Sequence, residues 1–369
     1  MAGGGPGAFI GPVHRMAAEL DGKIRLVAGA FSRDPEKSEA AAAAWGVRGY
    51  GDWREMLAAE AAREDGAELV AIVTPNATHF EISSAALDAG LHVMSDKPAT
   101  RTLAEAQELA KRVQASGRLY GLTYVYTGYP LVREAREMVR RGDLGQVRKI
   151  VVEYAQGWLS QPIERSGNRQ AAWRADPAQA GEGGCIGDIG VHAFNLAEFV
   201  GGLRVERLCA DVATVVPGRT LDDDCNVLLR FEGGARGVLI ASQISAGARN
   251  GLRISVYGET GGLTWSHERP NELVIDRLDG PSQVLHAGSP YLGQGGARLP
   301  TGHPEGFIEA FASLYRDLAA AIAEGRADAA PVPGISEGVR GMAFVERAVA
   351  AGRAGEGWIA LEGAPSCAR

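Results

Sequence analysis

The segment MAGGGPGAFIGPVH, residues 1–14, poses the question on which the fold depends. Gly3, Gly5 and Ala8 fit the pattern G-x-G-x-x-[G/A], a loop whose backbone approaches the pyrophosphate of a dinucleotide. Such a loop normally connects a buried parallel strand to a helix, and the phosphates sit on the N-terminus of that helix. Here almost nothing precedes the first glycine. Taken alone, the segment fits a flexible glycine tail as well as it fits a dinucleotide site.

The first third of the chain alternates strand and helix patterns. Compact apolar runs at 23–31, 68–74 and 91–95 each end in turn-forming residues and predict buried strands, and 119–126 can close the sheet. The clearest helix covers 102–116, where the sequence opens with a capping box and ends at a glycine. Strands that alternate with helices predict a parallel, doubly wound α/β sheet of the Rossmann type.

This order of elements favours the dinucleotide site. The glycines are followed by a helix pattern at 12–20 and then by the run 23–31, as a dinucleotide-binding fold requires apart from its first strand. That strand is central in such a fold, and without it the backbone groups of its neighbours stay unpaired. We therefore expect the first strand to be missing or truncated here, and several more apolar residues to precede Met1 in the native protein.

The second part of the chain has a different pattern. Helices are predicted at 130–142, which ends at a glycine, and at 305–324, which has an aromatic and leucine face. The connections 232–235 and 259–262 have hairpin composition and predict an antiparallel sheet. The strand-like runs of this large open sheet lie at 147–154, 225–231, 236–245 and 252–258.

The length of 369 residues suits two domains, a Rossmann domain over 1–124 and an α+β domain for substrate binding and self-association over 125–369. The net charge of -7 and the lack of a basic block argue against nucleic acid as a partner. No apolar run approaches the length of a membrane span, and no signal peptide precedes the glycines. Four cysteines without metal-ligand spacing predict reduced, mostly structural thiols in a cytoplasmic protein: Cys185, Cys209, Cys225 and Cys367.

Two clusters of polar residues are candidates for chemistry. Lys97 follows the run 91–95, at the end of a parallel strand, where open α/β sheets place their ligands. Asp188 and His192 are four residues apart, which puts both on one face of a helical turn. His192 suits a general base, and an ammonium such as that of Lys97 stabilises a developing alkoxide. The Asp188 carboxylate can orient the imidazole or hold a neighbouring hydroxyl.

Each of these residues also has a simpler interpretation. Lys97 fits a solvated loop lysine, Asp188 a helix cap and His192 a hydrogen-bonded core histidine. The combination of all three, at these spacings and in this fold, favours a catalytic trio.

At these residues the sequence resembles the glucose–fructose oxidoreductase/inositol dehydrogenase (Gfo/Idh/MocA) family, over nearly the whole chain. The family combines a glycine loop, an E-K-P motif and a G-G-x-x-x-D-x-G-x-H motif at similar spacings. Here the second motif reads Asp96-Lys97-Pro98, and the third is matched at Asp188 and His192. Asn195 stands where many members have an aspartate, and Thr127 where many have an arginine, so the substrate contacts there are expected to differ.

The resemblance implies a bound NAD or NADP. Gly11 and His14 match the family's G-x-x-H, which makes residues 6–10 a local insertion. An acidic residue after the second strand favours NAD, but Ser32 and Arg33 stand there and can accept a 2′-phosphate, which leans toward NADP. Alternatively, Arg33 stacks on the adenine and Asp34 serves the ribose. The residues expected to contact the cofactor are Gly3, Gly5, Gly7, Ala8, Phe9, Ile10, Ser32, Arg33, Thr74, Pro75, Asn76, His79, Asp96, Lys97, Trp173 and Arg174.

The resemblance also implies an activity. We expect an NAD(P)-dependent dehydrogenase that acts on a secondary hydroxyl of a sugar, a sugar derivative or an inositol, without a metal. The expected substrate contacts are Lys97, Tyr126, Arg174, Asp188, His192 and, from a distant loop, His303. Two alternatives occur among relatives: an NAD-dependent glycosidase that acts by transient oxidation and elimination, and a non-catalytic nucleotide sensor. The broad face of the open sheet predicts a homodimer or homotetramer.

Overall fold

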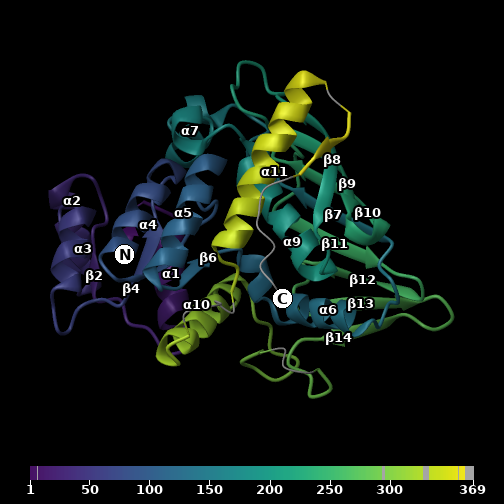
Figure 1. Ribbon diagram of the computed structural model, residues 1–369, viewed down its shortest axis with the longest axis horizontal. Coiled ribbons are helices and arrows are strands. Elements are labelled where there is room, and N and C mark those ends of the chain that lie inside the picture. The colour runs from purple at the N-terminus through teal and green to yellow at the C-terminus, as the bar shows by residue number, and fades with distance from the viewer. Residues whose placement is uncertain (6, 293–295, 327–331, 356, 362–369) are drawn as a thin grey trace. The chain divides into compact units, whose positions relative to one another are not determined.

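The computed structural model describes the whole chain except residues 6, 293–295, 327–331, 356 and 362–369 (Figure 1). Pro6 and Cys367 therefore lie outside the described residues. The chain divides into two compact units. The first is Met1–Val125 with Phe307–Val339, and the second is Tyr126–Gly306 with Arg340–Arg369.

This division differs from the expected domains in one respect. The first unit ends one residue after the expected boundary, but α10 (Phe307–Ala323) returns to it. The reason is that the buried face of α10 packs against α1 (Ile10–Leu20). His14 on α1 lies 5.0 Å from Phe311 on α10, measured between ring centroids. The sequence pattern predicts the helix but not the element against which it packs.

The first unit is built on short parallel strands. Pairing runs β1-β4-β5-β6 and β2-β3, and a parallel bridge between Ala2 and Ala30 connects the two sets. The resulting order, β3-β2-β1-β4-β5-β6, is that of the Rossmann fold and confirms the expected fold class. The strands are β1 (Ala2–Gly3), β2 (Ala28–Gly29), β3 (Arg48–Gly49), β4 (Leu69–Val73), β5 (His92–Ser95) and β6 (Tyr120–Leu122).

A short first strand, β1, is present before the glycine loop, where the sequence leaves the existence of a strand uncertain. Gly3 N–H donates to the carbonyl of Ala30 at 2.8 Å, and Ala30 N–H donates to the carbonyl of Met1 at 3.0 Å. On the other side, Ala2 lies opposite Ile72 of β4. Two residues therefore form a strand that is paired on both sides, so of the two expectations, a missing or a truncated strand, the structure has a short strand. The expectation of further apolar residues before Met1 stays a prediction.

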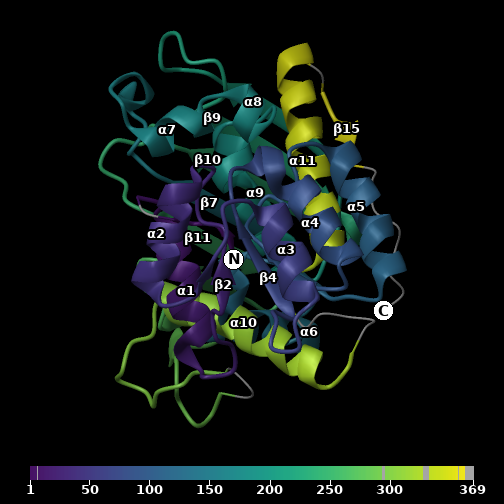
Figure 2. The same ribbon diagram turned by 90° about the vertical axis from the view of Figure 1, so that its left-hand side faces the viewer.

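Helices pack beside this sheet, and α4 contacts both α3 and α5 (Figure 2). The capping box predicted at Thr102 is present, and Gly117 ends α5 with φ 62°. Two expected strands are shorter than predicted, since 23–31 gives only β2 and 119–126 gives β6 followed by the 3₁₀ turn η2 (Val125–Gly128). The remaining helices of this unit are α2 (Pro35–Trp45), α3 (Trp53–Ala61), η1 (Asn76–Thr78), α4 (His79–Asp88) and α5 (Leu103–Ser116).

The second unit contains a nine-stranded sheet in the order β14-β13-β12-β11-β7-β10-β9-β8-β15. The sheet is mainly antiparallel, as predicted. However, β7 lies between β10 and β11 and runs parallel to β10, a pair that consecutive hairpins do not predict. The strands are β7 (Lys149–Ala155), β8 (Val205–Ala213), β9 (Asp224–Phe231), β10 (Arg236–Ser242), β11 (Gly251–Tyr257), β12 (Gly261–Ser266), β13 (Glu272–Arg277), β14 (Gln283–His286) and β15 (Ile359–Ala360).

One face of this sheet is covered by α9 and α6 (Figure 1). The sequence analysis did not predict α11 (Ile335–Ala354), whose Phe344 stacks on Phe194 of α9 at 4.4 Å between ring centroids. None of the helices in the described ranges combines the length and apolarity needed to cross a membrane. The other helical elements are α6 (Pro130–Arg141), η3 (Ile163–Arg165), α7 (Arg169–Arg174), α8 (Pro177–Ala180), η4 (Ile186–Gly190), α9 (Val191–Gly201) and η5 (Glu232–Gly234).

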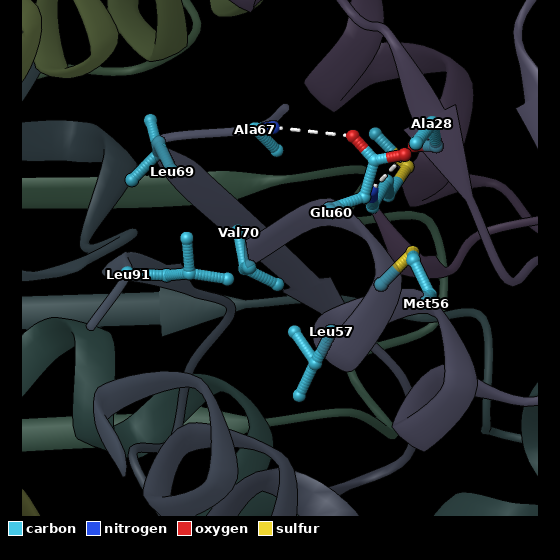
Figure 3. Close-up of a pocket in the computed structure, with 9 residues that line it drawn as sticks. Ala28, Met56, Leu57, Glu60, Ala67, Leu69, Val70 and Leu91 are labelled. Carbon is cyan, nitrogen blue, oxygen red and sulfur yellow. Dashed lines mark hydrogen bonds between the residues drawn. The ribbon is translucent and has the colours of Figure 1, made fainter. Parts of the chain in front are cut away.

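A small cavity lies in the core of the first unit (Figure 3). Its volume is about 10 Å³, room for one water molecule at most. Glu60 at its edge is buried, and its carboxylate accepts hydrogen bonds from Arg48, Tyr50 and the backbone of Ala67. Its lining includes no predicted site residue, so we assign the cavity to core packing.

Candidate active site

The glycine loop of the first unit is packed too closely for side chains. A Cβ atom on Gly11 would lie 2.0 Å from the carbonyl oxygen of Gly4, and one on Gly5 would lie 2.5 Å from that of Phe31. Gly3 and Gly4 also have φ angles of 80° and 77°, a backbone region that side chains disfavour. The loop is therefore built for close contact with its surroundings, which favours a dinucleotide loop over a flexible tail.

The start of α1 suits an anion. Phe9 is its N-cap residue, no described side chain caps the helix, and its first turn holds no acidic residue. The first N–H groups of a helix lack intrahelical partners and attract negative charge. Gly7 has φ 82° and open space where a Cβ would point. The expectation that this loop, with Ala8 and Ile10, contacts the pyrophosphate of a dinucleotide stays a prediction.

The loop after β2 presents a serine and an arginine. Arg33 is exposed, and Ser32 Oγ accepts the N–H of Asp34 at 3.1 Å. Asp34 caps α2 by accepting the N–H of Lys37, and its ion pair with the Lys37 ammonium spans 3.0 Å. The hydrogen bonds from Lys37 hold the pKa of Asp34 below its usual range. Asp34 is thus committed to the helix, and the expectation that Ser32 and Arg33 read the adenosine ribose stays a prediction.

His79 joins the loops that follow β4 and β5. Its Nε2 lies 2.8 Å from the carbonyl oxygen of Thr74, and its Nδ1 lies 2.8 Å from that of Pro98. Both ring nitrogens of this buried residue are thus used by the protein backbone. The expectation that His79 itself contacts the cofactor stays untested, and its contacts are those of a positioning residue. Thr74, Pro75 and Asn76 form the loop that it holds.

Lys97 follows β5 directly and is half-buried. The carboxylate of Asp96 accepts the backbone N–H of Lys97 at 2.8 Å and the hydroxyl of Thr123 at 2.7 Å. Asp96 therefore fixes the backbone from which Lys97 projects. This places Lys97 at the carboxyl end of a parallel strand, where the fold binds its ligands.

His14 is fully buried on α1, and its Nδ1 lies 2.7 Å from the hydroxyl of Tyr315. Its Nε2 has no hydrogen-bond partner among the described residues. Burial lowers the pKa of His14 to about 4, while the charge of Asp96 acts in the opposite direction. The imidazole is therefore neutral at physiological pH.

In the second unit, Asp188 and His192 lie on one continuous helical segment. Asp188 belongs to η4, a π-helical turn in which the N–H of Val191 donates to the carbonyl of Ile186, five residues back. His192 follows in the first turn of α9 and is buried. The expected α-helical spacing therefore passes through a wider turn, of a kind that is frequent at functional sites.

Asp188 is held by two donors. Its Oδ2 accepts Nε of Arg174 at 3.1 Å and Nε2 of Gln243 at 2.9 Å. Arg174 is itself fixed, because its Nη1 donates to Gln170 and its guanidinium lies 4.2 Å from the ring centroid of Trp173. Arg174 thus holds the Asp188 carboxylate, and Trp173 packs against the Arg174 guanidinium. Their expected contact with the cofactor stays a prediction.

Tyr126 lies between two histidine rings. Its ring centroid is 5.1 Å from that of His192 and 5.3 Å from that of His267, both edge to face. Its hydroxyl contacts that of Tyr154 and accepts Nδ2 of Asn250 at 3.3 Å. Burial raises the pKa of Tyr126 to about 12, so the hydroxyl keeps its proton at neutral pH and can donate it in a hydrogen bond.

The polar network continues through two amides. Oδ1 of Asn250 accepts the hydroxyl of Tyr154 at 2.7 Å and Nε2 of Gln156 at 2.8 Å, and its Nδ2 lies 3.2 Å from Nδ1 of His267. Oε1 of Gln156 accepts the indole N–H of Trp158 at 2.9 Å. Donors and acceptors therefore alternate through this cluster of side chains.

The sequence patterns do not point to the residues of this cluster and its neighbour on Asp188: Tyr154, Gln156, Gln243, Asn250 and His267. A signal was present for Gln156 and Gln243, which directly follow β7 and β10. These strands are parallel and end together at Ala155 and Ser242, so their next residues lie at one edge of the sheet. The hairpin patterns alone predict a purely antiparallel sheet, and from such a sheet one does not expect Gln156 and Gln243 to lie at the same edge.

His303, by contrast, is exposed, and its Nδ1 lies 3.2 Å from the carbonyl oxygen of Pro300. The described contacts do not connect it to His192 or Tyr126. Besides His192, the second unit places His267 beside Tyr126, and His267 also lies 3.1 Å from the hydroxyl of Tyr129. The proposed role of His303 therefore rests on the sequence alone.

Comparison with known proteins gives this geometry its context. Residues 3–124 match the oxidoreductase family with an NAD-binding Rossmann fold, and residues 132–264 match the GFO/IDH/MocA C-terminal domain. The Bacillus subtilis (strain 168) protein "Uncharacterized oxidoreductase YfiI" is 34% identical over 97% of this chain and 95% of its own. The chain belongs to the GFO/IDH/MocA family of oxidoreductases.

Two other members of the family bear on the site. The solved inositol dehydrogenase homolog from Azotobacter vinelandii, complexed with NAD⁺, is 38% identical, has a TM-score of 0.94, and the match covers 98% of this chain and 96% of that one. The same homolog has also been solved with NADH and myo-inositol. Levoglucosan dehydrogenase from Pseudarthrobacter phenanthrenivorans is 26% identical over 96% of both chains. The chain is therefore an oxidoreductase of this family with an NAD-binding Rossmann domain.

Proposed function

We propose that the protein is an NAD(P)-dependent dehydrogenase of cyclic polyols, which transfers a hydride between the nicotinamide and a secondary hydroxyl of an inositol, a sugar or a sugar derivative. The observation that supports this most is the fixed carboxylate of Asp188 on the same helical segment as His192, next to a cluster of hydrogen-bonding side chains. The related proteins complexed with or named for inositol and levoglucosan support the substrate class.

In this proposal His192 takes the proton of the reacting hydroxyl, since an imidazole suits general base work near neutral pH. Asp188 accepts a hydrogen bond from a substrate hydroxyl while Arg174 and Gln243 hold its orientation. Lys97 stabilises the negative charge that develops on the reacting oxygen. The nicotinamide, when bound, accepts or returns the hydride. Tyr126 keeps its proton and binds a further hydroxyl.

For the cofactor, we propose that the enzyme accepts NAD and that Arg33 decides how far it accepts NADP. The related structures complexed with NAD⁺ or NADH support the first statement. The commitment of Asp34 to capping α2 supports the second, since the Asp34 carboxylate is used within the protein while Arg33 beside it is exposed. A guanidinium there favours a 2′-phosphate.

We also propose that the protein works as a homodimer or homotetramer, because the nine-stranded sheet has a second face with half-exposed apolar residues. The cytoplasmic location expected from the cysteine usage stays a prediction.

Turnover tests the proposed function. We expect reduced nicotinamide to accumulate when NAD or NADP is mixed with a panel of inositols, hexoses and anhydrosugars. Lys97→Ala and His192→Ala should abolish it, whereas Lys111→Ala on α5 and His286→Ala on β14, both exposed, should not. Tight cofactor binding without turnover on any polyol would instead favour the glycosidase or the sensor.

A further inference from the structure

Asp222 lies between β8 and β9 and holds three consecutive backbone N–H groups. Its Oδ1 accepts the N–H of Gly184 at 2.6 Å, and its Oδ2 accepts that of Ile186 at 2.7 Å. Its backbone carbonyl accepts the N–H of Cys185 at 2.8 Å. The carboxyl group is buried, with 8% of the residue exposed. One residue therefore binds the whole start of η4, the turn that carries Asp188.

The two segments meet without space between them. A Cβ atom on Gly184 would lie 2.3 Å from the carbonyl oxygen of Asp222, so the glycine permits the contact. The carbonyl of Gly184 accepts the N–H of Asp188 at 2.8 Å, which links the turn held by Asp222 to the catalytic carboxylate. His192 follows on the same segment. A displacement at Gly184 is therefore transmitted to both residues.

The ionisation state of Asp222 fits its role as an acceptor for these backbone N–H groups. Burial raises its pKa to about 6, and the charge of Asp223 acts in the same direction, while the two N–H groups lower it. At neutral pH the carboxylate is thus ionised and accepts both N–H groups. The carboxylate of Asp223 is separately engaged, since Arg219 lies 3.0 Å from it and the N–H groups of Val215 and Val216 donate to it.

We propose that Asp222 is a positioning residue for the dehydrogenase reaction, because its carboxylate fixes the start of η4 and with it the places of Asp188 and His192. This inference rests on the proposed function. In this role Asp222 acts through the backbone of the helical turn that it holds.

Kinetics test this role. In Asp222→Asn one acceptor of the carboxylate becomes a donor facing an N–H group, so the turn loses a contact while the volume is kept. We expect kcat to fall about ten- to a hundred-fold, as for other small displacements of catalytic groups, with KM for the cofactor unchanged. The matched control Asp211→Asn, at an exposed position of β8, should leave both unchanged. An unchanged kcat in Asp222→Asn, or a loss confined to the cofactor KM, would overturn the proposal.

A second readout needs no turnover. The second test uses NMR on protein whose 7 histidines carry a nitrogen isotope. The substitution Asp222→Asn should shift the imidazole NMR signals of His192 and leave those of the exposed His286 in place. Unmoved His192 signals would contradict the proposal even if no polyol is oxidised. Conversely, a wild-type enzyme without turnover would refute the proposed function while this comparison still decides the role of Asp222. If Asp222→Asn fails to fold, Asp222→Glu, which keeps the carboxylate, should retain the His192 signals better than Asp222→Ala.

Discussion

The side-chain amide of Gln243 donates a hydrogen bond of 2.9 Å to Oδ2 of Asp188. Gln243 directly follows β10, so the end of a sheet strand fixes a carboxylate that lies on a helix. Arg174 donates to the same oxygen from α7. A carboxylate with donors from a strand end and from a helix keeps one orientation, as a group that must meet a substrate hydroxyl requires.

Removing that amide should weaken catalysis. In Gln243→Ala, Asp188 keeps only Arg174 of these two donors, and a hydrogen bond to a charged group is worth about 1.5–3 kcal/mol. We expect kcat/KM for the polyol to fall about ten- to a hundred-fold in steady-state kinetics. Gln283→Ala, an exposed position on β14, is the matched control. Equal kcat/KM values in the two variants would remove Gln243 from the site.

Removing the Arg33 side chain should lower activity with NADP but not with NAD. In Arg33→Ala, the loop after β2 loses the cation that can pair with a 2′-phosphate. We expect kcat/KM for NADP to drop about ten-fold or more, with little change for NAD. Arg25→Ala, before β2, serves as the control substitution. A parallel loss with both cofactors would mean that Arg33 stacks on the adenine instead.

The stability of the fold should depend on pH through His14. Burial lowers its pKa from 6.5 to about 4, so unfolding takes up a proton between these values. This contribution is present at high pH and lost as the pH falls. From pH 8 to pH 5, the linkage amounts to about 2 kcal/mol of unfolding free energy.

Urea unfolding of the wild type and of His14→Gln checks this dependence. Other groups titrate equally in both proteins, so the wild-type advantage in unfolding free energy should shrink by about 2 kcal/mol between pH 8 and pH 5. A constant difference over that range would show that His14 is not held neutral by burial.

The open face of the nine-stranded sheet should mediate self-association. Leu228, Val238 and Val151 lie directly opposite one another across β9, β10 and β7, on the face that α9 does not cover. We expect the wild type to sediment as a dimer or tetramer at micromolar concentration. Val151→Glu should lower its mass, because a carboxylate in a buried interface is costly. Leu278→Glu, in an exposed turn, should have no effect, and a wild-type monomer would contradict the prediction.

Much of the Rossmann unit follows from local signals. The capping box at Thr102, the glycine after α5 and the apolar run of β4 are each specified by a few neighbouring residues, and the structure has all three. The two-residue β1 escapes such signals, since its identity comes from pairing with Ala30 and β4. Likewise, the place of α10 follows from its packing on α1, a contact between distant parts of the chain.

The candidate site divides in the same way. Lys97 carries a motif signal because it directly follows a strand, and Asp188 and His192 carry one because their spacing within one helical segment is fixed. Gln243 and Asn250 come to Asp188 and Tyr126 only through the order of strands in the sheet, which includes a parallel pair that hairpin patterns do not predict. Long-range pairing, not residue type, decides which polar side chains meet.

The proposed hydride transfer is tested most directly by following deuterium from the substrate. The wild-type enzyme would be incubated with NAD and myo-inositol that carries deuterium on its ring carbons, and the nicotinamide analysed by mass spectrometry. We predict one deuterium in the reduced cofactor and a ketone product, both absent in His192→Ala and Lys97→Ala. Loss of the label to solvent without accumulation of reduced cofactor, or a cofactor that never becomes labelled with any polyol of the panel, would contradict a dehydrogenase.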